Sequence, residues 1–175
     1  MNNMNIHLSR SYFILTGGVA VLLVLLLPYS LAWASGTATV SATVTVQNIS
    51  VTVSSGTVTW GTLGSNTASS TNPAYTQVIT NSGNVAEDFT VVGQNSTNWT
   101  LAGTNGSNQY VEEFCNTGCT SAPTGFTPLT LTNQTLATNI AASSTTNLDL
   151  YILTPNPSTV FTSQSVSVTI TAAAY

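Results

Sequence analysis

Five carboxylates are the main acid–base candidates of this chain. They are Glu87, Asp88, Glu112, Glu113 and Asp149. A glycosidase needs two such acids about 5 to 10 Å apart. Neighbouring residues of a strand point to opposite faces, so a catalytic pair would have to combine acids from two different strands.

One acid of each doublet shares a face with apolar residues. Glu112 alternates with Tyr110 and Phe114, and Glu87 alternates with Phe89. We interpret these acids as positions at a bulge, at a sheet edge or on the rim of a sheet. The spacing of the acids is not that of a calcium-binding loop. We therefore predict no catalytic carboxylate and no metal site.

The hydroxyl groups of this chain lack a base to activate them. The single Arg10 and the single His7 precede the apolar run at 12–27, and the chain contains no Lys. Nucleophilic triads need such a base and are excluded. No Gly-rich loop leads from a strand into a helix, so no cofactor is expected. Without Lys or Arg to neutralise phosphates, nucleic-acid binding is excluded as well. We predict that the protein is not an enzyme.

The only two cysteines lie close together in "CNTGC". Cys115 and Cys119 are expected to form a disulfide in an exported chain, and Gly118 helps the small loop to close. A zinc site would normally need four ligands, and no His follows His7. The spacing also differs from that of a C-x-x-C redox motif.

The sequence offers candidate sites for covalent glycosylation and candidate residues for glycan binding. Five N-x-[ST] sequons are candidate N-glycosylation sites, at Asn48, Asn95, Asn98, Asn105 and Asn133. Trp99 and Tyr110 are candidate glycan contacts. The simpler interpretation is that Trp99, like Trp60, belongs to the core or rim of the fold, since large aromatic residues dominate such cores.

Residues 1–34 are typical of an export signal. A short basic segment, "MNNMNIHLSR", precedes a long apolar run, and "AWA" places small residues before a cleavage site after Ala34. The apolar run approaches the roughly 20 residues that span a bilayer, so an uncleaved anchor is the alternative. We expect two parts, 1–34 and 35–175, and a secreted or cell-surface protein that meets the membrane only through the N-terminal helix if it stays.

The rest of the chain alternates apolar and polar residues with a period of two, which predicts strands. Gly, Ser, Asn and Pro clusters separate the runs. We expect a single antiparallel β-sandwich, immunoglobulin-like or jelly-roll, with about eight to ten strands. Loops are expected at 64–73 and 115–128. Strands are expected at 37–46, 49–53, 57–63, 74–80, 85–93, 99–101, 108–115, 129–141, 145–154 and 164–173.

Two sequence segments resemble segments of known β-sandwich proteins. "VITNSGNV" at 78–85 resembles the strand-turn-strand phrase of secreted immunoglobulin-like and surface-repeat domains. The closing stretch at 148–171 is similar to the C-terminal hairpin of secreted bacterial sandwiches, including the biofilm-fibre proteins of the TasA and camelysin type. This resemblance implies a structural role at the cell surface or in a matrix, and it carries over no catalytic residue.

The first alternating run suggests how the protein works. Residues 37–46 have no charge and no Pro, and Val40, Ala42, Val44 and Val46 share one face. Such a strand, left exposed, would pair with another sheet. We expect a structural filament or matrix subunit that associates with itself or with other surface proteins. The alternatives are a polysaccharide-binding adhesin module and a pilin-like subunit that retains residues 11–34 as a helix.

Overall fold

The computed structural model describes residues 36–175. The predicted export segment, its helix and the cleavage site after Ala34 lie outside the described residues. The described chain divides between Thr43 and Val44, and every strand belongs to the part from Val44 to Tyr175. Among residues 36–175 there is no helix long and apolar enough to cross a membrane.

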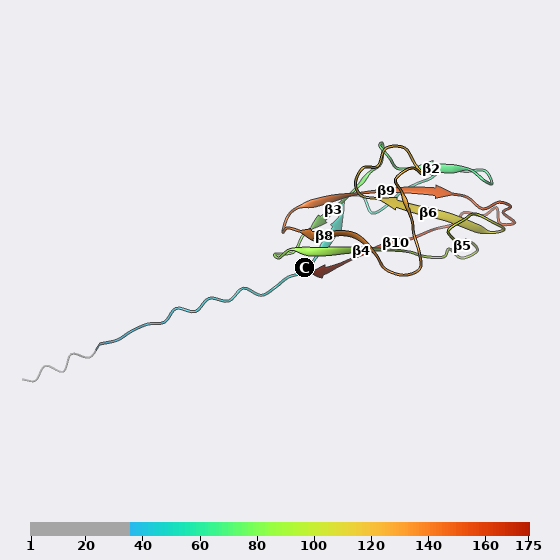
Figure 1. The fold of residues 1–175 in the computed structure, drawn as a ribbon. Helices are drawn as coiled ribbons and strands as arrows, with labels where there is room; N and C mark the ends of the chain where they lie inside the picture. Colours follow the sequence, from blue (N-terminus) through green and yellow to red (C-terminus); the bar gives the residue numbers. More distant parts are fainter. Residues whose placement is uncertain (1–35) are drawn as a thin grey trace, which may run out of the picture. The chain divides into compact units, whose positions relative to one another are not determined.

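The described chain is all-β, as predicted, with ten strands in two sheets (Figure 1). The first sheet has the main order β1-β3-β9-β6-β5, with β2 pairing with β9 and β7 with β6. The second has the order β10-β4-β8. All pairs are antiparallel except β5 with β6. The strands are β1 (Val51–Val53), β2 (Ala68–Ser70), β3 (Gln77–Asn81), β4 (Glu87–Gly93), β5 (Thr100–Leu101), β6 (Gln109–Cys115), β7 (Thr127–Pro128), β8 (Gln134–Ile140), β9 (Thr145–Leu153) and β10 (Val168–Ala174).

Alternation builds one core from both sheets. In β3 and β4 every second residue is buried, which places Ile79, Phe89 and Val91 inside. Buried residues of β6, β8 and β9 join the same cluster. Period-two patterning puts alternate side chains on one face of each sheet, so the two apolar faces exclude water together.

Two expected strands do not form. Residues 37–46 and 57–63 contain no strand in the structure. Gly56 has the positive φ, 66°, expected of a tight turn, but the chain beyond it does not pair back onto β1. Instead, Val58 and Trp60 pack their side chains against the core. Core contacts of side chains therefore replace the strand that was predicted at 57–63.

The phrase at 78–85 is a crossing between sheets rather than a hairpin. Strand β3 pairs with β1 and β9, whereas β4 pairs with β10 and β8. Buried Asn81 holds the crossing: its Nδ2 donates to the Val85 and Ile140 carbonyls, each at 2.8 Å, and its Oδ1 accepts from Gly83 N at 2.8 Å. One side chain thus supplies the partners that strand pairing would otherwise provide.

The closing stretch at 148–171 is likewise not a hairpin, because β9 and β10 belong to different sheets. Two short strands also lie in segments that the sequence predicts as loops. Strand β2 pairs with β9, and β7 pairs with β6. Strands of two or three residues show too little alternation to be recognised in the sequence.

Candidate functional site

An open groove of about 490 Å³ lies beside the edge strands β1 and β10. Its walls come from β1, residues 56–60, residues 165–167 and the first residues of β10. Leu148 and Leu150 of β9 also line it, together with Gln77 and Glu112. The groove is therefore lined by apolar and polar groups in similar measure, and it lies where neither sheet continues.

Two stretches beside this groove are extended but unpaired. In the part of the chain that the structure describes, residues 57–63 and 161–166 form no backbone–backbone hydrogen bond. Both stretches nevertheless alternate half-buried and exposed residues, most regularly from 164 to 170. Backbone N–H and C=O groups are normally paired in a sheet or with water. These stretches have the side-chain pattern of strands and lack the neighbouring strand.

Two polar oxygens at the groove have no partner. Gln77 Oε1 and Glu112 Oε2 are buried, and neither has a hydrogen-bond partner among residues 36–175. Glu112 is 1% exposed in the middle of β6, opposite Ile152 of β9. Its interpretation as a bulge, edge or rim residue was wrong. Burial removes water from the carboxylate and raises the pKa of Glu112 to about 7.

Glu87 is also fully buried, on the same face of β4 as Phe89. Its Oε1 accepts a hydrogen bond from Ser50 N at 2.8 Å. The pairing of β4 with β8 is irregular between Glu87 and Phe89, in keeping with the predicted bulge. Asp88 points the other way and accepts from Asn139 N at 2.8 Å. The first doublet thus serves the local structure at this bulge.

The second doublet also splits between two faces of its strand. Glu113 is only half-buried, unlike its neighbour. The pKa of Glu113 is raised by partial desolvation. No group of three or more His, Cys, Asp or Glu side chains in residues 36–175 is placed to hold a metal ion.

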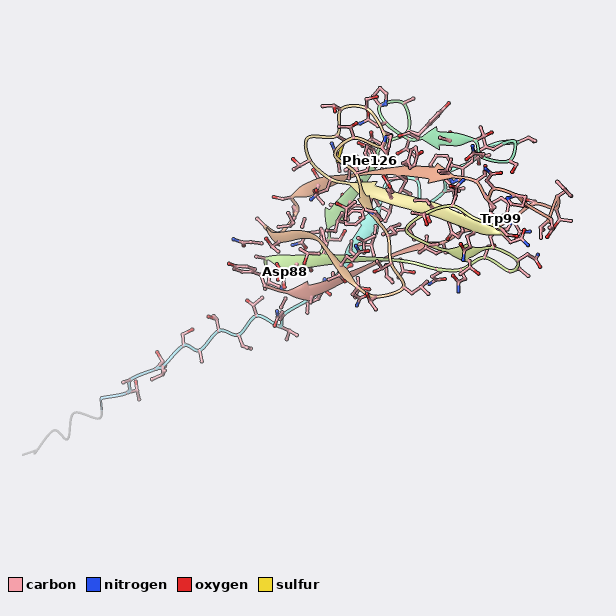
Figure 2. The ribbon with its side chains drawn as sticks, turned by 45° about the vertical axis from the view of Figure 1, so that its right-hand side comes forward. Asp88, Trp99 and Phe126 are labelled. Carbon is pink, nitrogen blue, oxygen red and sulfur yellow. A yellow bond between two sulfur atoms is a disulfide. The ribbon has the colours of Figure 1, made fainter. Side chains whose placement is uncertain are left out.

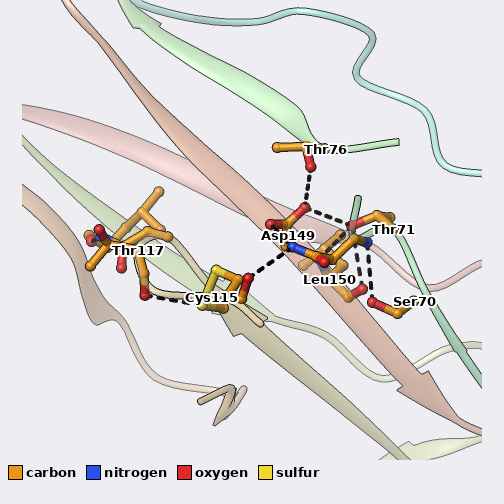
Figure 3. The surroundings of a disulfide bond; sticks show 11 residues. Ser70, Thr71, Thr76, Cys115, Thr117, Asp149 and Leu150 are labelled. Carbon is orange, nitrogen blue, oxygen red and sulfur yellow. Dashed lines mark hydrogen bonds between the residues drawn. A yellow bond between two sulfur atoms is a disulfide. The ribbon is translucent and has the colours of Figure 1, made fainter. Parts of the chain in front are cut away.

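The disulfide joins Cys115 to Cys119, with Gly118 at a φ of 67° inside the loop (Figure 3). Asp149 lies opposite Cys115 on β9. The Asp149 carboxylate accepts from Thr76 Oγ1 at 2.5 Å and from Asn72 Nδ2 at 2.9 Å. Both carboxylate oxygens are thus engaged by neutral donors from the segment before β3. Nothing in the sequence indicated this network, because its members are far apart in the chain.

A second hollow, of about 390 Å³, is lined by Trp60, Trp99 and Phe161 among other residues. Trp99 lies at the opposite end of the strand layers from Asp88 (Figure 2). Tyr110 is 0% exposed, and its hydroxyl donates to the Gln94 carbonyl. Tyr110 therefore cannot present its ring to a sugar, and that assignment was wrong. Trp99 is half-buried with its ring 6.2 Å from Tyr110, as a residue at the rim of the core.

The sequons occupy different surroundings. Asn48, Asn95, Asn98 and Asn133 are exposed. Asn105 is half-buried, and its Nδ2 donates to Asn66 Oδ1 at 2.8 Å and to the Thr154 carbonyl at 3.3 Å. A glycan on Asn105 would replace a hydrogen that these bonds use. Glycosylation stays a prediction at all five positions.

The proposed assembly residues are exposed. Val40, Val44 and Val46 are 94%, 90% and 82% exposed, and Ala42 is exposed as well. Asn84 holds the chain where it enters the domain: Asn84 Nδ2 donates to the Val46 carbonyl at 2.8 Å. Residues before this contact form no strand in the described chain.

The described residues thus offer an open groove, two unpaired extended stretches and an exposed alternating segment. Comparisons with known proteins found no family model, no curated protein and no solved structure that matches this chain.

Proposed function

We propose that this protein is an exported structural subunit, secreted or held at the cell surface, that associates with itself through residues 37–46. Its folded part is a single β-sandwich of the immunoglobulin-like or jelly-roll kind. One observation carries the proposal. The segment with the regular alternation of a strand forms no strand among residues 36–175, and its valines are almost fully exposed.

An exposed segment of this composition favours pairing. Its unpaired N–H and C=O groups form a template for another strand, and natural proteins usually guard such edges with charge or Pro. Residues 37–46 have neither. High β-propensity with low charge is also the composition of segments that assemble into stacked strands. Assembly would bury the valines and pair the backbone in one step.

The remaining chemistry supports an extracellular building block. The disulfide is typical of an oxidising compartment. After Arg10 the chain contains no cation, so contacts between copies cannot rely on side-chain ion pairs. Backbone pairing between strands does not require cationic side chains, because it needs only N–H and C=O groups.

The test uses the full chain exported by a producing cell. N-terminal sequencing defines the start, and electron microscopy with light scattering measures assembly. We expect a mature N-terminus at Ser35. We also expect filaments or oligomers, and Val44→Asp should abolish this assembly. Thr45→Asp is the matched control, since it adds the same charge on the opposite face. A strictly monomeric protein, with residues 37–46 protected from hydrogen exchange inside their own domain, would overturn the proposal. A start at Ser11 would favour the pilin-like alternative.

A second candidate function is polysaccharide binding. Phe161 is 90% exposed beside the hollow that contains Trp60 and Trp99. Exposed aromatic faces suit stacking on sugar rings. Binding to polysaccharides that Phe161→Ala removes, while Leu131→Ala at another exposed apolar position leaves it unchanged, would support this function.

A further inference from the structure

We infer that the open groove beside β10 is the acceptor for residues 37–45 of a second copy, which enter as a strand between residues 57–63 and residues 161–170. This inference rests on the proposed self-association and assigns the surface that receives the segment. It needs no charged contact and no cofactor.

The two unpaired stretches define where a strand is missing. Residues 57–60 and 165–170 line the groove, while residues 60–65 and 158–164 line the neighbouring hollow. The same two stretches therefore run together along both openings. In the described chain, residues 57–63 and 161–166 have no backbone partner in any sheet. A strand placed between them could pair with both rows of N–H and C=O groups, at the usual spacing of about 4.8 Å on each side.

The edge of β10 extends this acceptor. Strand β10 pairs with β4 on one side and ends its sheet on the other. Val168 and Ile170 of β10 line the groove, so the first residues of this strand lengthen the acceptor. Residues 161–170, if fully paired, would match about 33 Å of strand, and residues 37–45 would supply about 30 Å.

The side chains match as well as the lengths. Val58, Val166, Val168 and Ile170 pack against the core but stay only half-buried, because the groove beside them is open in the described part of the chain. A donor strand would insert its apolar face here and leave Ser41, Thr43 and Thr45 outside. Apolar area on both partners would then leave water together.

A second copy is the occupant to which the structure points. Val44 and Val46, in the same compact part of the chain as the strands, are 90% and 82% exposed, so they do not fill the groove of that part. Asn84 fixes the chain at Val46, and residues 37–45 precede this contact. Each copy thus carries one donor segment and one open acceptor, and such head-to-tail contacts lead to open-ended filaments or rings.

Disulfide trapping in the full exported chain tests the assignment. One population carries Thr43→Cys, and the other carries Ser165→Cys, Ser167→Cys or Thr169→Cys, which are exposed positions at successive places along the acceptor. The two populations are mixed before assembly and oxidised. Thr135→Cys and Thr138→Cys are matched controls, exposed on β8 at the other edge of the same sheet.

We expect a disulfide-linked pair of different copies, at least tenfold more abundant with one of the three acceptor positions than with either control. Filaments that are cross-linked only through the β8 positions, or that are not cross-linked at any position, would overturn the acceptor while leaving self-association intact. A wild-type chain that never assembles would overturn both. Val168→Asp gives an independent readout: it should stop growth, whereas Thr169→Asp should not.

Discussion

Glu112 and Tyr110 point into the same core from alternate positions of β6, and neither faces a cation among residues 36–175. Both side chains are buried. Desolvation raises the pKa of Tyr110, and the Glu112 charge raises it further. Glu112 thus has no favourable partner for its ionised form among the described residues. The neutral acid is the state that this core accommodates.

Stability should therefore fall as the pH rises. The pKa of Glu112 is about 7 in the folded chain against a usual value of 4.5, so folding takes up a proton between these values. Its contribution is fully present below about pH 4.5 and is lost as the pH rises through about 7, by on the order of 3 kcal/mol. Denaturant titrations from pH 4 to 8 measure this loss.

The matched variants are Glu112→Gln and Glu113→Gln. The first removes the buried titration and should flatten the profile, while the second changes a half-buried acid and should leave most of the slope. Equal slopes in wild type and Glu112→Gln would contradict the assignment.

Asn81 should be the most sensitive polar residue of the sheet crossing. Asn81→Ala removes three side-chain hydrogen bonds and leaves the Val85 and Ile140 carbonyls without these donors. We expect a loss of about 2 to 4 kcal/mol in the free energy of unfolding. Asn84→Ala removes exposed side-chain hydrogen bonds in the same turn and should cost less than half as much free energy of unfolding. Similar losses for both would show that burial is not the deciding factor.

Gly83 should tolerate no side chain. A Cβ there would overlap Glu87 Oε1 and the Asn48 carbonyl, and the latter belongs to backbone that cannot easily move. We expect Gly83→Ala to destabilise the domain by about 1 to 3 kcal/mol. Gly103→Ala is the control, because nothing lies within 4 Å of its added Cβ. Thermal unfolding of the two variants provides the comparison, and equal melting temperatures would refute this steric account.

The disulfide should contribute moderately to stability, because it closes a small loop. Cys115→Ala with Cys119→Ala should cost about 2 kcal/mol, as expected from loop-closure entropy for so few residues. The Asp149 network should persist, since its donors come from Thr76 and Asn72. Thr76→Val added to the double variant separates the two effects. Complete unfolding of the double alanine variant alone would mean that the loop organises the domain.

Local patterning predicted much of the fold. The strands β4, β6, β8 and β9 lie within expected segments, and β3 and β10 each extend one residue beyond theirs, because half-buried strands must alternate. The disulfide and the contribution of Gly118 to its small loop could also be predicted, because both depend on residues close together in the sequence. The pairing of the strands could not be predicted locally. Strands β3 and β4 are consecutive but belong to different sheets, because the Asn81 side chain hydrogen-bonds the turn between them and each strand pairs elsewhere.

The candidate site also has some features that the sequence predicts and others that only the tertiary structure decides. Alternation and absent charge in residues 37–46 were readable from the sequence, as was the lack of a base for nucleophilic catalysis. The groove could not be predicted from the sequence, because it arises where the edges of β1 and β10 leave residues 57–63 without a neighbouring strand. Nor could the sequence place Glu112 at that groove or bury Tyr110. Side-chain periodicity is a property of neighbouring residues, whereas edges, grooves and desolvated carboxylates exist only once distant strands have packed.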